Sequence, residues 1–303
     1  MPSFKLASAC ALLALSAAAP AAPVLDATPR TAVVSAFGPE EPLLLKQAAD
    51  KREHLVNGVR FTTALLEGQP VLLFMSGVSM SNAAMNTQLA LDRFNVRRIV
   101  FSGIAGGVDD QLRIGDVAVP RRWGNYAEAI YARETAPGRY APPPYADPAA
   151  RANYGMIHPR DIKLATADGG SETRFWFEVD PGLLQLAKGL PADTLRRCDA
   201  AQRCLSAPPR IVAGGSGLSG PIFMDNAGYR DYLAKTYLAQ VVDMETAAVA
   251  QVAHANRVPF IAFRSLSDLA GGSEHANEMD TFMQIAADNA ANTVRGLLRA
   301  LKR

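Results

Sequence analysis

Short apolar runs rich in β-branched residues recur along the chain and predict strands separated by turns. The clearest of the early runs are TAVVSAF at 31–37, RRIVFSGIAGG at 97–107 and IGDVAVP at 114–120. Segment 58–77 holds two further strands around the turn Gly68-Gln69-Pro70. The run at 97–107 is predicted to end in a glycine-rich turn.

Helical periodicity fills the intervals between these strands. LLLKQAAD at 43–50 is predicted to be helical, and Met80, Ala84, Thr87 and Leu91 share one helical face. Towards the end of the chain, strands at 239–245 and 258–265 alternate with helices at 246–256 and about 276–301. Strands that alternate with helices indicate an α/β fold.

The central strands are apolar on both faces, as expected for a sheet that is covered on both sides. We therefore expect a single α/β domain with a central mixed, mostly parallel β-sheet flanked by helices. The domain is predicted to span 22–303, with an irregular, proline-rich insertion at about 121–209.

The N-terminus has the pattern of a signal peptide at 1–21. Lys5 precedes an apolar run at 6–15, and Ala19-Pro20-Ala21 offers small residues for cleavage after Ala21. An uncleaved anchor is the alternative, but a membrane span needs about 20 apolar residues. The mature protein is therefore expected to be exported, periplasmic or extracellular, with no membrane attachment.

Export makes the remaining cysteines informative. Cys198 and Cys204 stand six residues apart in a polar, loop-like stretch. In an oxidising compartment they are expected to form a local disulfide. A zinc site is disfavoured, because the two thiols have no nearby histidine.

The composition excludes several classes of protein. The chain has 303 residues, of which 49% are hydrophobic and 20% charged, with a formal net charge of +2. These values are typical of a globular protein rather than a disordered one, and they do not suggest a nucleic-acid surface. The histidines show no metal spacing, so no metal and no cofactor are expected.

Acidic residues follow several apolar strands, where ligands bind in α/β sheets. Glu245 follows VVDM, Asp268 follows RSLS, and Glu40 lies in the turn GPEEP. Each has a structural alternative: a helix-start acid for Glu245, a cap or an ion pair with Arg264 for Asp268, and a solvated turn for Glu40. The glycine-rich SGIAGG at 102–107 matches neither a dinucleotide fingerprint nor a P-loop.

Three segments occur together in one order: FSGIAGGVDDQLRIGDVAVP, VVDMETAAVAQVA and VPFIAFRSLSDLAGG. Together they resemble the nucleoside phosphorylase and nucleosidase superfamily over about 31–301. The similarity is nearest to the methylthioadenosine/S-adenosylhomocysteine nucleosidases and to exported relatives that include bark storage proteins. FMDNAGYRDYL at 223–233 resembles the latter. The resemblance implies a three-layer αβα fold and a nucleoside ligand.

The resemblance also implies roles for the acids. Glu245 matches the glutamate that binds the ribose hydroxyls, beside Met244. Asp268 matches the acid that protonates N7 of the purine, with Ser267 and Arg264 as candidates for holding it. Protonation at N7 makes the base a better leaving group.

Further positions match the base and water sites of the family. Phe223 matches the aromatic residue that stacks on the purine, and Met224 brings backbone groups to its edge. Glu40 matches the glutamate that activates water, with Glu41 as the alternative. The glycine-rich segment contributes Ile104, Ala105 and Gly106; the nucleosidases have a hydroxyl residue where this chain has Ile104.

Hydrolysis is favoured over phosphorolysis. The phosphate-binding arginine and serine of the phosphorylases fall at Phe101 and Ile104, and neither side chain can bind an anion. The resemblance therefore implies a purine nucleosidase for adenosine-type or 5′-thio nucleosides that forms a homo-oligomer. A phosphate-dependent purine nucleoside phosphorylase and a non-catalytic nucleoside-binding or storage-type protein are the alternatives.

Overall fold

The computed structural model describes residues 23–146, 151–271 and 277–302. The predicted signal peptide at 1–21 therefore lies outside the described residues. Within the described ranges, no helix is both long enough and apolar enough to cross a membrane.

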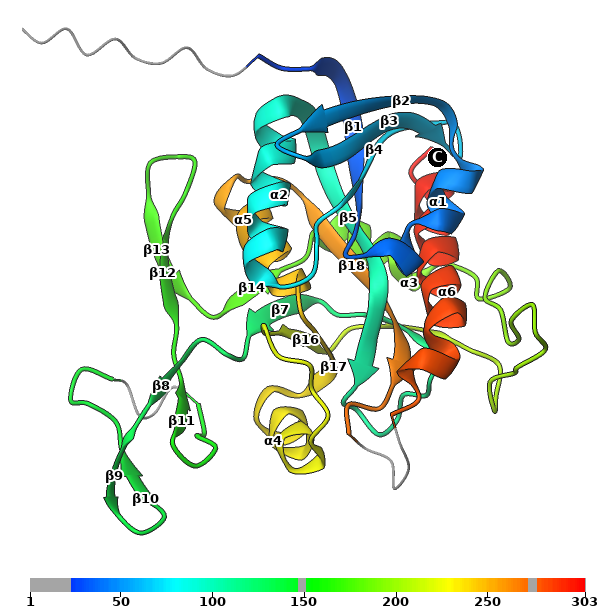
Figure 1. The fold of residues 1–303 in the computed structure, drawn as a ribbon. Coiled ribbons are helices and arrows are strands. Elements are labelled where there is room, and N and C mark those ends of the chain that lie inside the picture. The colour runs from blue at the N-terminus through cyan, green and yellow to red at the C-terminus, as the bar shows by residue number, and fades with distance from the viewer. Residues whose placement is uncertain (1–22, 147–150, 272–276, 303) are drawn as a thin grey trace, which may run out of the picture.

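A large mixed sheet forms the centre of the molecule (Figure 1). The N-terminal half of the sheet comes from β1 (Asp26–Ser35), β2 (Ala49–Val56), β3 (Val59–Leu66), β4 (Gln69–Met75) and β5 (Phe94–Gly107). The remaining strands of this sheet are β6 (Val117–Val119), β7 (Arg122–Asn125), β14 (Trp176–Glu178), β15 (Ile211–Ala213), β16 (Ser216–Ser219), β17 (Ala239–Asp243) and β18 (Phe260–Asp268).

Strand β5 lies at the centre of the sheet and pairs with three other strands. It pairs in parallel with β1 on one edge and with β18 on the other, while β17 pairs antiparallel with its last residues. The register with β18 aligns Arg264 with Gly103 and Asp268 with Gly106. The residues at the C-terminal ends of β5 and β18 are thereby brought together.

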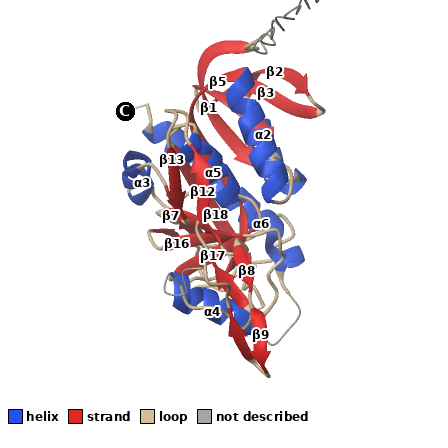
Figure 2. Cartoon of the chain, turned by 90° about the vertical axis from the view of Figure 1, so that its left-hand side faces the viewer, coloured by secondary structure: helices blue, strands red, loops and turns tan. Residues whose placement is uncertain are grey.

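Helices cover both faces of the sheet (Figures 1 and 2). One layer contains α2 (Met80–Arg93) and α5 (Thr246–Ala255), which pack against each other. The opposite layer contains α1 (Pro42–Gln47), α3 (Pro181–Lys188) and α6 (Met279–Ala300). Helix α4 (Ala227–Tyr237) packs on β17, and the short 3₁₀ helix η1 (Gly38–Glu40) follows β1. The predicted three-layer α/β domain is confirmed.

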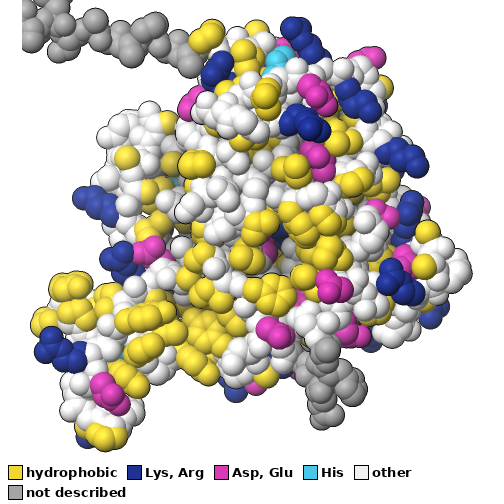
Figure 3. Space-filling model, in the orientation of Figure 1, with side chains coloured by type: hydrophobic (Ala, Val, Ile, Leu, Met, Phe, Trp, Pro, Cys, Tyr) yellow, Lys and Arg dark blue, Asp and Glu magenta, His cyan; other side chains and the backbone are white. Residues whose placement is uncertain are grey.

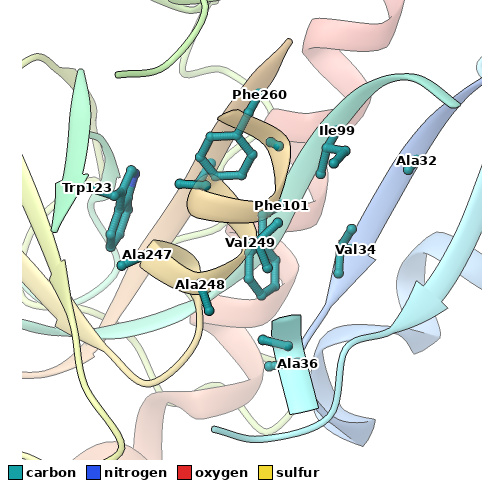
Figure 4. Packing of buried hydrophobic residues seen from close by; sticks show 14 of the residues in the cluster. Ala32, Val34, Ala36, Ile99, Phe101, Trp123, Ala247, Ala248, Val249 and Phe260 are labelled. Carbon is teal, nitrogen blue, oxygen red and sulfur yellow. The ribbon is translucent and has the colours of Figure 1, made fainter. Parts of the chain in front are cut away.

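Two apolar clusters fill the space between the layers. Figure 4 shows part of one of them, in which Phe101 of β5 and Val249 of α5 lie close to Val34 of β1. The second cluster joins the other face of the sheet to α1, α3 and α6. Burial of apolar surface on both faces, at about 25 cal/mol per Å², explains why the central strands read as almost continuously apolar.

The interval 121–209 contains more regular structure than the sequence predicts. Besides β7 and β14 it holds three small antiparallel pairs, which lie to one side of the main sheet (Figure 1). These pairs are formed by β8 (Ala129–Tyr131) with β11 (Ile157–Pro159), β9 (Arg133–Ala136) with β10 (Arg139–Ala141), and β12 (Ile162–Ala165) with β13 (Ser171–Arg174). The Sγ atoms of Cys198 and Cys204 lie within bonding distance, as the predicted disulfide requires.

Two predictions of local structure are wrong. Segment 43–50 is helical only to Gln47, because the chain then enters β2, an antiparallel partner of β3. The glycine-rich segment is not a turn: β5 continues through Gly107, because pairing with β18 satisfies its backbone groups. A Cβ atom on Gly103 would lie 1.9 Å from Nη1 of Arg264, so glycine here gives room to a side chain of the neighbouring strand.

Candidate functional site

A cavity of about 220 Å³ lies where β5, β17 and β18 meet. The predicted site residues other than Arg264 lie together around it, although they are far apart along the chain. The lining residues are Phe37, Glu40, Val78, Ile104, Ala105, Gly106, Ile222, Phe223, Met224, Val242, Asp243, Met244, Glu245, Ser267, Asp268 and Met279. Glu41 does not line the cavity, which favours Glu40 over that alternative.

Glu40 is held in place by the backbone. The short helix η1 turns its side chain inward, where its Oε1 accepts a hydrogen bond of 2.8 Å from the Ile104 N–H. Its Oε2 accepts from the Ala36 N–H. Burial raises the pKa of the Glu40 carboxyl, and these N–H groups together with Arg264 oppose the rise. The structural alternative of a solvated turn is therefore wrong for Glu40, whose side chain is buried.

Arg264 organises three buried acids. Its Nε lies 2.8 Å from Asp243 Oδ2, its Nη1 lies 3.5 Å from Glu40 Oε1, and its Nη2 lies 3.6 Å from Glu245 Oε2. The guanidinium also stacks on Phe101, 4.0 Å from the ring centroid. The side chain is fully buried, and its Nη2 makes no hydrogen bond within the described residues. One cation thus faces three carboxylates.

The sequence suggested that Arg264 holds Asp268, but in the structure it does not. In an extended strand, residues four apart are separated by about 13 Å, so their side chains cannot pair as they could on a helix. The predicted ion pair between these two residues is therefore wrong.

Asp243 is a site residue that the sequence reasoning missed. It ends β17, and its Oδ1 accepts hydrogen bonds from Ser219 Oγ and from the N–H groups of Glu245 and Thr246. These bonds fix the start of α5. The signal was present in VVDME, where Asp243 is an acid at the end of an apolar strand, two residues before Glu245.

Glu245 stands at the N-cap of α5 and faces the cavity. Its Oε1 accepts a hydrogen bond of 2.8 Å from the Ser79 N–H at the start of α2. Burial raises the pKa of Glu245 to about 7; Arg264 lowers it and Asp243 raises it further. A carboxylate at this position can accept hydrogen bonds from neighbouring hydroxyl groups of a ligand.

Asp268 ends β18, lines the cavity and is buried. Ser267 Oγ donates to its Oδ1 at 2.9 Å, as predicted, and the Ala270 N–H donates to its Oδ2 at 3.1 Å. Asn277 Nδ2 donates to the same Oδ2 at 3.0 Å, a contact that the sequence analysis did not foresee. The chain turns sharply here, with Ala270 and Gly271 both at positive φ.

The segment before α4 forms the open side of the cavity. Ile222 and Phe223 are 45% and 52% exposed, while Met224 is buried. Tyr126 Oη donates to the Ile222 carbonyl, which anchors the segment. An exposed aromatic face beside buried polar groups is suited to a flat ring. Phe37, Val78 and Met279 make another wall of the cavity apolar.

Ile104 contributes to the site mainly through its backbone. Its N–H holds Glu40, while its side chain packs against Ala286 and Ala287 of α6. In the described ranges, no group of three or more His, Cys, Asp and Glu side chains is arranged to hold a metal ion. Three acids of this site are paired instead with the guanidinium of Arg264.

Known proteins with similar sequences support the fold described above. The 5′-methylthioadenosine/S-adenosylhomocysteine nucleosidase of Bacillus cereus strain G9842 is 28% identical over 273 residues, which cover 90% of this chain and all of the relative. A relative of the same description from Bacillus anthracis strain CDC 684 is 28% identical over 278 residues, with the same coverage.

Solved structures share the fold at lower identity. The 5′-methylthioadenosine/S-adenosylhomocysteine nucleosidase of Neisseria meningitidis, in complex with methylthio-immucillin-A, has a TM-score of 0.65 and 21% identity, covering 89% of this chain and 98% of that one. The futalosine hydrolase of Helicobacter pylori strain 26695 has a TM-score of 0.66 and 20% identity, covering 89% and 97%. The family model described as the phosphorylase superfamily matches residues 30–299. The chain therefore belongs to the phosphorylase superfamily.

Proposed function

We propose that this protein is a purine nucleosidase, which hydrolyses the N-glycosidic bond of adenosine-type or 5′-thio-substituted nucleosides. The observation that carries the proposal is the convergence of Glu40, Glu245 and Asp268 on one cavity. The relatives named as nucleosidases in the comparison support the same reaction class.

Each acid has a distinct role in the proposed reaction. Ionised Glu245 accepts hydrogen bonds from the ribose hydroxyls and orients the sugar, with Met244 beside it. Glu40 takes a proton from water, whose oxygen bonds to the anomeric carbon. The bond between that carbon and the base breaks, its electron pair stays on the base, and Asp268 supplies a proton to N7. Phe223 stacks on the purine, and Met224 meets its edge.

Phosphorolysis is disfavoured by the charges of the cavity. Phosphate needs cationic or hydroxyl donors, but Arg264 is already paired with three acids and Phe101 lies beneath it. Water has no such requirement. The apolar wall of Phe37, Val78 and Met279 suits an uncharged 5′ substituent such as a thioether.

One assay separates the three candidate functions. Purified protein is incubated with methylthioadenosine, adenosine and inosine, each with and without phosphate, and the free base is quantified. Base release without phosphate is expected. Release only in the presence of phosphate would instead identify a phosphorylase, and binding without release a nucleoside-binding or storage-type protein.

We also propose that the protein is exported and forms a homo-oligomer. Figure 3 shows hydrophobic side chains gathered over one region of the surface. Exposed hydrophobic residues also border the cavity, among them Val78, Ile222 and Phe223, and large exposed apolar patches are typical of interfaces. Light scattering of the purified protein tests the assembly. N-terminal sequencing of secreted protein tests cleavage after Ala21, and a mass measurement with and without reductant tests the disulfide between Cys198 and Cys204.

A further inference from the structure

Asn277 does not line the cavity, yet it touches the acid that does. Its Nδ2 lies 3.0 Å from Asp268 Oδ2 and 3.3 Å from Asp225 Oδ1. Its Oδ1 accepts a hydrogen bond of 2.9 Å from the Met279 N–H in the first turn of α6. Asn277 therefore joins three segments: the end of β18, the segment that carries Phe223, and the start of α6.

The orientation of this amide follows from its partners. A backbone N–H can only donate, so the atom that faces Met279 must be the oxygen. With the oxygen fixed in this way, the NH₂ group faces Asp225 and Asp268. The three contacts agree on one orientation, and both amide hydrogens have an acceptor.

We propose that Asn277 is a positioning residue for Asp268, which it holds at the distance from the purine that proton transfer requires. The inference rests on the proposed function. Ser267 and Ala270, the other donors to Asp268, come from its own strand and the turn after it. Asn277 instead connects the Asp268 carboxylate to α6 and to the segment that carries Phe223 and Met224.

The contact between Asn277 and Asp225 links the position of Asp268 to the position of the purine base. Phe223 precedes Asp225 by two residues, so a shift of this segment would move the stacking ring and one acceptor of Asn277 together. The two segments are already in close contact, since a Cβ on Gly271 would lie 2.4 Å from the Asn226 nitrogen. A misplacement of about 1 Å can reduce a rate by about 100-fold.

Asn277→Asp is the sharpest variant for a test. It has the same shape and keeps the acceptor for the Met279 N–H, but it loses both donors. We expect kcat for base release to fall by about 10- to 100-fold, with KM changed less than about 3-fold. A wild-type kcat would overturn the proposal. If the variant does not fold, Asn277→Leu, which is similar in size and uncharged, carries the same test.

A second variant separates positioning of Asp268 from simple tethering of two loops. Asp225→Asn combined with Asn277→Asp exchanges donor and acceptor, so the contact between 225 and 277 can form again while Asp268 still lacks its donor. We expect kcat to stay as low as in the single variant. Recovery to the wild-type kcat would show that Asn277 only ties the loops and would overturn the proposal.

The affinity for adenine, measured by calorimetry, keeps this test distinct from the test of the proposed function. If the wild type binds adenine but releases no base from nucleosides, the proposed function fails. The positioning of Asp268 by Asn277 can still be tested through the affinity for adenine. Asn277→Asp and the double variant are then expected to bind adenine about 3- to 10-fold more weakly, because adenine contacts the site through its base alone. Unchanged affinity overturns the positioning role, and a wild type that does not bind adenine overturns both proposals.

Discussion

Nη1 of Arg264 lies 3.5 Å from Oε1 of Glu40, and both side chains are almost completely removed from solvent. The same guanidinium also faces Asp243 and Glu245. Buried charges are tolerated only when they are paired and hydrogen-bonded. The site therefore depends on one arginine to keep three carboxylates in a small volume.

Replacing that arginine should affect both stability and activity. Arg264→Met leaves three acids without their cation, and breaking a buried pair typically costs about 3–5 kcal/mol. We expect the free energy of unfolding to fall by about this amount in urea titrations, together with loss of base release. Arg60→Met, at an exposed arginine, is the control and should leave both nearly unchanged. Equal stability of Arg264→Met and wild type would contradict this account.

Nucleoside affinity should depend on pH through Glu245. Burial raises the pKa of Glu245 to about 7, so the carboxyl gains a proton as pH falls below that value. A protonated carboxyl has lost acceptor capacity for the ribose hydroxyls. We therefore expect the affinity for a nucleoside to fall by about 10-fold for each pH unit below 7.

Adenine, which has no ribose, is the matched ligand for this experiment. Its affinity should change much less over the same range when both ligands are titrated by calorimetry. Glu245→Gln should bind nucleosides weakly at every pH. Parallel pH profiles for adenine and the nucleoside would rule out Glu245 as the source of the effect.

Asp268→Asn should separate binding from chemistry. The amide has nearly the same shape as the carboxyl, but it cannot transfer a proton to N7. General acid catalysis typically contributes about 100- to 10,000-fold, so kcat should fall within that range. Calorimetry should show ligand affinity within about 10-fold of the wild type. A variant that releases base at the wild-type rate would remove Asp268 from its proposed role.

Gly103→Ala tests the packing between β5 and β18. The added Cβ would lie 1.9 Å from Arg264 Nη1 and 2.5 Å from Glu40 Oε1. Because both groups are fixed by buried contacts, we expect a stability loss of about 1–3 kcal/mol and a large loss of activity. Gly38→Ala is the control, since nothing lies within 4 Å of a Cβ there. Thermal unfolding and base release provide the two measurements.

Much of the fold could be predicted because its strands are apolar on both faces and its helices have a clear period. The acids that follow these strands could also be predicted as site residues, since ligands bind beyond the strand ends of α/β sheets. The role of Glu40 could be predicted only from the resemblance to the family, because GPEEP by itself is typical of a solvated turn. One of the N–H groups that hold the buried Glu40 carboxyl belongs to Ile104, which lies 64 residues away.

The remaining contacts depend on tertiary register. The continuation of β5 through its glycines follows from pairing with β18, and local preference alone favours a turn. Arg264 could not be assigned its partners from spacing, because the strand holds it far from Asp268 and aligns it with Gly103. Asn277 reaches Asp268 only because α6 begins beside the end of β18.

The imbalance around Arg264 has a consequence for which metabolites can enter. Counted as formal charges, three acids and one guanidinium leave an excess of two negative charges beside the cavity, before Asp268 is added. A phosphorylated nucleotide would bring more negative charge into the same low-dielectric space, where like charges repel strongly. The described lining offers no compensating cation. We therefore expect the pocket to favour nucleosides over nucleotides through electrostatic repulsion.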